Sequence, residues 1–374
     1  MKKIYVDHAA TTELDTEAFE AMRPWLMSEY GNASGAYSFS RNPKRALREA
    51  REAIAACINA SPDEIYFTSG GTESDNWAIK GTALFHEKKR SIVTSEIEHH
   101  AVLYSAQYME SLGYSVTYVL PEKNGVIIPE ALKEHMPESA SMVSVMLANN
   151  EIGTVQPVRE LADIAHAYGA AFHTDAVQAV GHIDVDVKHL NVDMLSASAH
   201  KFNGPKGIGF LYIRRGVNLP SYLSGGAQEN GMRAGTENVA GIVGMSVALK
   251  NNVDNLKLTM QHIKNLEKQF VQKLNDSNIS YVRNGGNEML PGLISLSFEG
   301  KDGEAILHRM DLMGISLSTG SACNSHITQI SHVLQAIRLP ESLAKGTIRI
   351  SLGKNNTIED VNAIVTALKK ITSS

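Results

Sequence analysis

The sequence contains little cysteine, no long apolar run and no extended run of charge of one sign. Its two cysteines, Cys57 and Cys323, stand far apart without a CxxC spacing, which excludes a disulfide framework and a cysteine-rich zinc site. No stretch approaches the apolar length that spans a bilayer, and the first residues lack the apolar core of a signal peptide. We therefore expect no contact with a membrane and a cytoplasmic location, where thiols stay reduced.

The composition is that of an ordinary globular protein, with 43% hydrophobic and 20% charged residues in a chain of 374. A formal net charge of -5 without a basic stretch argues against a nucleic-acid partner. The 14 histidines show no paired spacing typical of metal ligands, so we expect no metal site. The length predicts two domains.

Short apolar runs alternate with helical stretches between residues 15 and 252. This alternation predicts βαβ units on a mostly parallel sheet, whose ligands bind beyond the carboxyl ends of the strands. A long helix at about 252–275 follows, and then a mixture of strands and helices that is typical of a smaller α+β domain. We thus expect an α/β fold with a large domain at 15–252 and a small domain made of 1–14 and 253–374. The expected strands of the large domain are 65–68, 91–95, 115–120, 142–147, 170–174, 194–198 and 207–213.

A glycine-rich turn at residues 69–75, with the sequence SGGTESD, lies between an expected strand and an expected helix. Glycines let the backbone approach an anion closely, and the first N–H groups of a helix attract negative charge. Thr72 with Asp75 also resembles a capping pair. A capped turn with nothing bound is therefore the competing interpretation, and for this turn taken alone it is the favoured one.

Asp175 and Lys201 each follow an expected buried strand. A buried aspartate needs a partner such as a cationic ring nitrogen, although a role as a helix cap would also account for it. A desolvated lysine can form a Schiff base, although most lysines, as we expect for Lys206, are ordinary surface residues. Both residues can face one crevice together with the turn at Thr72. An acid, an amine and an anion cradle at one sheet edge are what pyridoxal phosphate (PLP) requires.

Three further side chains are candidates for chemistry. His99 follows a strand and could stack on a planar cofactor, whereas we expect His100 to pack against the next helix. Cys323 lies among small polar residues and is a candidate nucleophile, whereas Cys57 lies in apolar sequence and is expected to be buried and inert. Arg349, inside an apolar strand, could bind a carboxylate with two hydrogen bonds or form a salt bridge at the domain interface.

Motifs along nearly the whole chain carry a resemblance to a known family. They are DHAATT at 7–12, TSGGTESDN at 68–76, EH at 98–99, NNEIG at 149–153, HTDAVQ at 173–178, AHK at 199–201, GGAQE at 225–229, RAGTEN at 233–238 and GSAC at 320–323. In these motifs the chain resembles the group I (NifS/IscS-type) cysteine desulfurases, class V aminotransferases of PLP fold type I. The lysine block and the cysteine loop are together the most specific part.

The resemblance implies an enzyme that converts L-cysteine to L-alanine and passes the sulfur on as a persulfide of Cys323. It implies that Lys201 holds PLP as a Schiff base and removes the α-proton, and that Asp175 pairs with the pyridine nitrogen. It further implies that the phosphate is bound by Gly71, Thr72, Ser198 and His200, and that Thr236 contacts the phosphate of the other subunit in a homodimer. It implies that Gln178 bonds to the ring hydroxyl oxygen and that His99 stacks on the ring and transfers protons. The substrate carboxylate is expected to be bound by Asn150 and Arg349.

The resemblance leaves the sulfur acceptor open between an iron–sulfur scaffold and proteins of tRNA thiolation or thio-cofactor synthesis. Two departures from the family pattern bear on that choice: Ala33 and Ile330 stand where proline is frequent. A selenocysteine lyase or another class V PLP enzyme is the alternative activity. A sulfur-relay module without catalysis is the alternative from another class, and the joint presence of Lys201, Asp175 and Cys323 argues against it.

Overall fold

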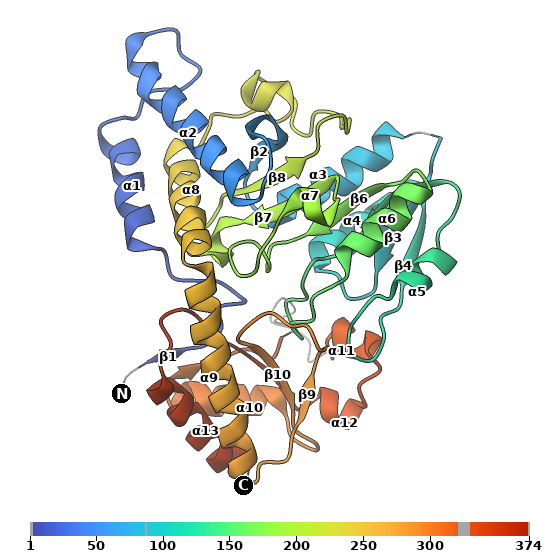
Figure 1. Ribbon diagram of the computed structural model, residues 1–374, viewed down its shortest axis with the longest axis vertical. Coiled ribbons are helices and arrows are strands. Elements are labelled where there is room, and N and C mark those ends of the chain that lie inside the picture. Colours follow the sequence, from blue (N-terminus) through green and yellow to red (C-terminus); the bar gives the residue numbers. More distant parts are fainter. Residues whose placement is uncertain (1–2, 87, 321–329, 373–374) are drawn as a thin grey trace.

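The computed structural model describes residues 3–86, 88–320 and 330–372 and has an α/β fold around a seven-stranded sheet (Figure 1). The expected mostly parallel sheet is confirmed. Among the described strands, β8 runs antiparallel to both of its neighbours, and the remaining pairs of this sheet are parallel. The strands in spatial order are β2 (Ile65–Thr68), β8 (Gly209–Ile213), β7 (Met194–Ser198), β6 (Ala171–Asp175), β5 (Ala140–Ser144), β3 (Ser91–Ser95) and β4 (Ser115–Val119).

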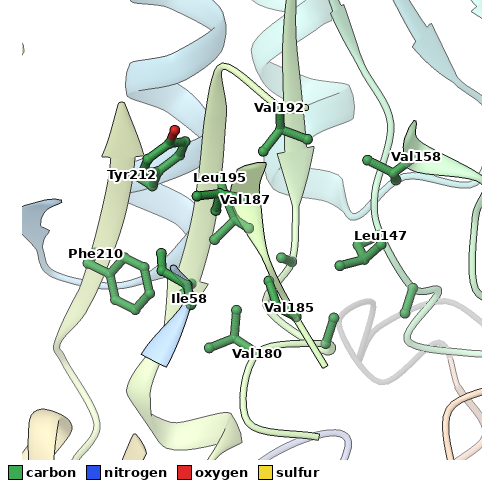
Figure 2. Packing of buried hydrophobic residues seen from close by; sticks show 14 of the residues in the cluster. Ile58, Leu147, Val158, Val180, Val185, Val187, Val192, Leu195, Phe210 and Tyr212 are labelled. Atoms are coloured by element: carbon green, nitrogen blue, oxygen red, sulfur yellow. The ribbon is translucent and has the colours of Figure 1, made fainter. Parts of the chain in front are cut away.

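Helices cover both faces of this sheet, so its central strands are buried along nearly their whole length instead of alternating between buried and exposed residues. In β7, Met194 packs in one cluster with Trp77, whereas the next residue, Leu195, packs in a second cluster with Phe210, as Figure 2 shows for the latter two. Successive residues of a strand point to opposite faces, and both faces are dry. The helices of this part are α1 (Thr16–Met27), α2 (Arg41–Cys57), α3 (Gly71–Phe85), α4 (His100–Ser111), α5 (Pro129–Glu134), α6 (Val158–Ala167), α7 (Val187–Leu190) and α8 (Val239–Asp254).

A further hydrophobic cluster, separate from the two on the faces of the sheet, contains residues of the C-terminal part of the chain together with Ile4 and Val6. Strand β1 (Ile4–Tyr5) pairs with β11, and Figure 1 shows the N-terminal segment lying among the C-terminal elements. The division into 15–252 and 1–14 with 253–374 remains a prediction, which these separate clusters support. The elements of this part are α9 (Leu256–Asp276), β9 (Val282–Asn284), β10 (Leu293–Ser297), α10 (Gly303–Leu312), β11 (Ile315–Ser316), α11 (His332–Ala336), α12 (Glu341–Ala344), β12 (Thr347–Ser351) and α13 (Ile358–Thr372).

Helix α8 is one of the elements that the sequence pattern does not predict, as are α1, α7, β9 and β11, and the helix expected at 252–275 begins at Leu256. Helix α8 packs against both α1 and α2. Its buried residues, among them Ile242, Met245 and Leu249, lie beside buried small residues instead of forming one stripe. A helix that is enclosed on several sides lacks the 3.6-residue alternation that identifies an amphipathic helix.

None of the helices within residues 3–86, 88–320 and 330–372 combines the length and the apolar character that crossing a bilayer requires.

Replacement of Leu195 by Ala should lower the free energy of unfolding by about 2–5 kcal/mol, because the fully buried side chain leaves a cavity. Leu312 is 84% exposed, so Leu312→Ala is the matched control and should change stability by less than about 0.5 kcal/mol. Urea denaturation of both variants measures the difference. Equal losses would contradict the packing described for β7.

Candidate active site

Strand ends of the seven-stranded sheet surround a cavity of about 500 Å³. It opens where β2, β6 and β7 end, as expected for the carboxyl edge of a parallel sheet. A larger hollow of about 930 Å³ lies beside α9 and gathers none of the predicted residues. The predicted site residues that line the 500 Å³ cavity are Gly71, Thr72, His99, Asn150, Asp175, Gln178, Ser198, His200, Lys201 and Arg349.

The N-terminus of α3 faces this cavity. Its N-cap residue, Gly70, has a φ of 148° and no side chain with which to cap the helix, so the first N–H groups are left for a ligand. A Cβ atom on Gly71 would lie 2.6 Å from Cγ2 of Val177, so a larger residue does not fit at that position. The side chain of Ser198, at the end of β7, lies beside these glycines. The helix dipole favours an anion at this place.

The expected capping pair of Thr72 and Asp75 is wrong. The carboxylate of Glu73 instead accepts a hydrogen bond from the backbone N–H of Ser69 at 2.8 Å. Asp75 is 1% exposed, and its Oδ1 atom has no hydrogen-bond partner among the described residues. Sequence reasoning did not predict Asp75 as a residue of the cavity, because the capping pattern already gave it a structural role.

Asp175 is the last residue of β6 and is 4% exposed. Its Oδ1 accepts a hydrogen bond from the backbone N–H of Val177 at 2.9 Å, as a capping aspartate would. Burial raises the pKa of this carboxyl to about 6, while the Val177 N–H and the nearby charge of Lys201 act in the opposite direction. Gln178 lies one turn further on and donates its Nε2–H to the carbonyl oxygen of Ala9 at 2.9 Å.

Lys201 follows β7 in a short 3-10 helix (Ala199–Lys201) and reaches toward the N-terminal segment. Its Nζ donates to the carbonyl oxygens of Ala9 at 2.6 Å and Ala10 at 2.8 Å. Sequence reasoning matched the DHAATT motif without giving these residues a role, because a backbone carbonyl leaves no signal in the side-chain pattern. Lys206, which the sequence suggests is an ordinary surface lysine, is exposed and also lines the cavity.

His99 caps α4 and is held in one orientation. Its Nδ1 accepts a hydrogen bond from the backbone N–H of Ala101 at 3.1 Å, so the proton of the neutral ring is on Nε2. The preceding residue, Glu98, is fully buried, and its carboxylate accepts from the backbone N–H of Met146. As expected, His100 packs instead, with its ring 5.1 Å from that of Tyr104.

Arg349 in β12 is 4% exposed and forms a salt bridge with Asp7, whereas its binding of a substrate carboxylate remains a prediction. One amino group donates to Oδ1 of Asp7 at 2.7 Å, and the other donates to the carbonyl oxygen of Asn150 at 2.8 Å. The guanidinium therefore connects β12 to Asp7 of the N-terminal segment and to Asn150, and it also lines the cavity.

Among the described residues, Thr236 is the predicted site residue that does not line this cavity, and it lines a separate hollow of about 170 Å³. Cys323 lies outside the described residues, although Gly320, just before that segment, lines the cavity. Cys57 is half-buried, where full burial was expected, and burial raises the pKa of its thiol to about 11.

Comparison with known proteins identifies the family. The aminotransferase class-V family matches residues 4–364. The chain is 46% identical over 373 residues to the cysteine desulfurase IscS of Dictyoglomus turgidum, covering 99% of this chain and 94% of that protein. It is 43% identical over 371 residues to the cysteine desulfurase IscS of Methanosarcina thermophila, covering 99% and 92%.

Solved structures agree. A NifS-like protein superposes with a TM-score of 0.94 at 38% identity and covers 100% of both chains. A structure described as SspA in complex with cysteine has a TM-score of 0.83 at 36% identity and covers 95% of this chain and 100% of that one. Family, sequence and fold agree over nearly the full length, and the chain therefore belongs to the cysteine desulfurases of the aminotransferase class-V family.

Proposed function

We propose that this chain is a PLP-dependent cysteine desulfurase that converts L-cysteine to L-alanine and carries the sulfur on Cys323. The observation that carries the proposal is the meeting of the Lys201 amine, the Asp175 carboxyl and the N-terminus of α3 in one cavity. Membership in the class-V family supports the same cofactor.

The residues of the cavity fit PLP. The uncapped helix start at Gly70 and Gly71 leaves N–H groups for a phosphate. Thr72, Ser198 and His200 line the same end of the cavity and would add donors to the phosphate. When bound, PLP supplies an aldehyde that condenses with amines and a cationic ring that accepts electrons from the carbon beside the amine.

Lys201 would hold the aldehyde carbon, and Asp175 would face the ring nitrogen as the buried acceptor for its proton. Gln178 would contact the ring hydroxyl oxygen. His99 would stack on the ring as a neutral imidazole, because burial and, to a smaller extent, the charge of Lys201 lower its pKa to about 4. A neutral ring with its proton on Nε2 can stack without repelling a cation and can still pass on a proton.

The substrate carboxylate would be bound by Arg349 together with Asn150. Arg349 is held by Asp7 and the Asn150 carbonyl, and its buried Nε has no partner among the described residues. A guanidinium fixed on two sides with N–H groups to spare is suited to two-point binding of a carboxylate. The solved relative in complex with cysteine supports cysteine as the substrate.

The sulfur transfer would proceed at Cys323. The Lys201 amine takes the α-proton of the substrate. The Cys323 thiolate attacks the substrate sulfur, so an S–S bond forms while the Cβ–S bond breaks. The electron pair of that bond goes to the β-carbon, which takes a proton, and alanine leaves while the persulfide stays on Cys323.

A homodimer would complete the phosphate site, since Thr236 lies outside the cavity of its own chain and would serve the cavity of a second copy. The persulfide would pass to an iron–sulfur scaffold or to a protein of tRNA thiolation or thio-cofactor synthesis. An enzyme with a reactive thiol is suited to the reducing cytoplasm.

Three cysteine and lysine variants test the proposed chemistry. Cys323→Ala should lose alanine formation from cysteine by about a thousandfold or more but keep the visible absorbance of the bound cofactor. Lys201→Ala should lose both, because its amine holds the cofactor. Cys57→Ala is the matched control and should keep both. Full desulfurase activity in Cys323→Ala would refute the assigned acceptor.

Arg349→Lys should raise KM for cysteine with a smaller effect on kcat, because a lysine cannot make two parallel hydrogen bonds to a carboxylate. A lost hydrogen bond to a charged group is worth about 1.5–3 kcal/mol, which is a factor of about 10 to 150 in kcat/KM. Cysteamine, which lacks the carboxylate, is the control substrate and should react equally with both proteins. A parallel loss with cysteamine would show that Arg349 has another role.

His99→Asn removes a titrating ring and keeps a capping oxygen for α4. The unfolded chain binds a proton near pH 6.5, whereas folded His99 resists protonation down to about pH 4. The ring therefore contributes stability that is present above pH 6.5 and is lost as the pH falls toward 4, by about 1.4 kcal/mol per pH unit. Urea unfolding between pH 7 and 5 should show this loss in the wild type relative to the variant, and parallel curves would contradict it.

A further inference from the structure

Asp75 is a buried acid to which the proposed reaction gives no role. It lies on α3, one turn beyond the start of the helix, and lines the cavity while being 1% exposed. Its Oδ1 has no hydrogen-bond partner among the described residues. One oxygen of Asp75, one oxygen of Asp175 and one ring nitrogen of His99 all lie within 4.8 Å of one another. A buried and unpaired carboxylate oxygen is costly unless the group takes up a proton.

Among the residues that the structure describes, none offers Asp75 a cation of its own. From β6, Nε2 of His173 lies 3.6 Å from Oδ1, but burial lowers the pKa of that histidine to about 3, so the ring is neutral. The same nitrogen contacts the hydroxyl of Ser196 in β7 at 2.9 Å. From the segment before α4, buried Glu98 adds a second acid and His99 a neutral ring.

The titration of this group follows from that setting. Burial raises the pKa of Asp75 well above its ordinary value, and the charge of Asp175 raises it further. The Ser196 hydroxyl acts in the opposite direction, and the charge of Glu98 adds a smaller increase. Lys201 acts on Asp175, whose pKa it lowers. Two buried carboxyls with oxygens within 4.8 Å of each other repel when both are ionised, and the one without a nearby cation is the one that keeps a proton.

We propose that Asp75 is a positioning residue that holds a proton between itself and Asp175, so that the floor of the cavity carries one negative charge instead of two. The proton would be donated toward Asp175, which thereby stays the ionised member of the pair. This shared proton does not depend on the proposed function. Its consequence, that Asp175 is kept ready for a cationic ring nitrogen, rests on that function.

Infrared spectroscopy of the full-length chain, freed of cofactor and labelled with ¹³C in its aspartate carboxyls, tests the shared proton. The label separates aspartates from Glu98 and Glu151, whose buried carboxyls also have raised pKa values. At pH 7 the wild type should show the carbonyl band of a protonated aspartic acid, and Asp75→Asn should lose it. Asp63→Asn, in which an exposed carboxylate is removed, is the charge-matched control and should keep the band.

A wild-type spectrum without this band, or the same band in Asp75→Asn, would overturn the proposal. The measurement is repeated with EDTA, because a band that appears only after a chelator is added would mean that a cation neutralises the pair, which also overturns it.

The affinity for PLP shows whether Asp75 acts by donating a hydrogen bond to Asp175 or only by occupying its place in the packing. Asn can still donate to Asp175, so Asp75→Asn should bind PLP nearly as tightly as the wild type, whereas Asp75→Ala should bind about tenfold or more weakly. Equal weakening in both variants would refute the donor role. If no form of the chain binds PLP, the proposed function fails while the infrared result on the proton stands.

Discussion

The cost of burying Asp175 is the constraint on which the cavity depends. This carboxyl ends a strand that is buried on both faces, where an anion without partners loses several kcal/mol of hydration. Strand register sets what surrounds it, because Asp175 lies opposite Ser196 of β7, and β7 leads directly into Lys201. A slip of one residue would turn Asp175 to the other face of the sheet. The spacing between acid and amine is therefore fixed by the core packing of the sheet.

The N-terminal segment makes the second set of constraints. Asp7 holds Arg349 across 342 positions of sequence, and the carbonyl oxygen of Ala9 accepts hydrogen bonds from both Lys201 and Gln178. Thr12 bonds to the backbone of His200. One short segment thus contacts the amine of Lys201, the amide of Gln178 and the guanidinium of Arg349. Its geometry exists only once the first and last parts of the chain have come together, which makes the cavity a property of the completed fold.

Sequence reasoning succeeded where one local pattern decides the outcome. Strands β2, β3 and β7 begin and end where the apolar runs predict, and the turn after β2 is the helix start that its glycines indicate. It failed at α8, because a helix buried on several sides lacks the 3.6-residue alternation of apolar and polar residues. It also failed at Asp75, because the capping pattern gave no sign of an unpaired buried acid. It could give no role to the Ala9 carbonyl, because main-chain acceptors leave no residue preference. Thr236 lines a separate hollow, and its contact with the cavity of a second copy remains a proposal.

The charge balance of the cavity explains why several weak donors gather at the start of α3. Burial and, to a smaller extent, the charges of Lys201 and Lys206 lower the pKa of His200 to about 4, so this histidine is neutral at pH 7. Arg233 is already paired with Glu73 at 2.8 Å. A phosphate here would therefore be met mainly by backbone dipoles and hydroxyls, with Lys206 as the nearby cation at the exposed rim. Such donors bind an anion without adding a buried cation that would compete with Lys201 for Asp175. The affinity for a phosphate and the electrostatic interaction between Lys201 and Asp175 therefore do not depend on each other, although both belong to one cavity.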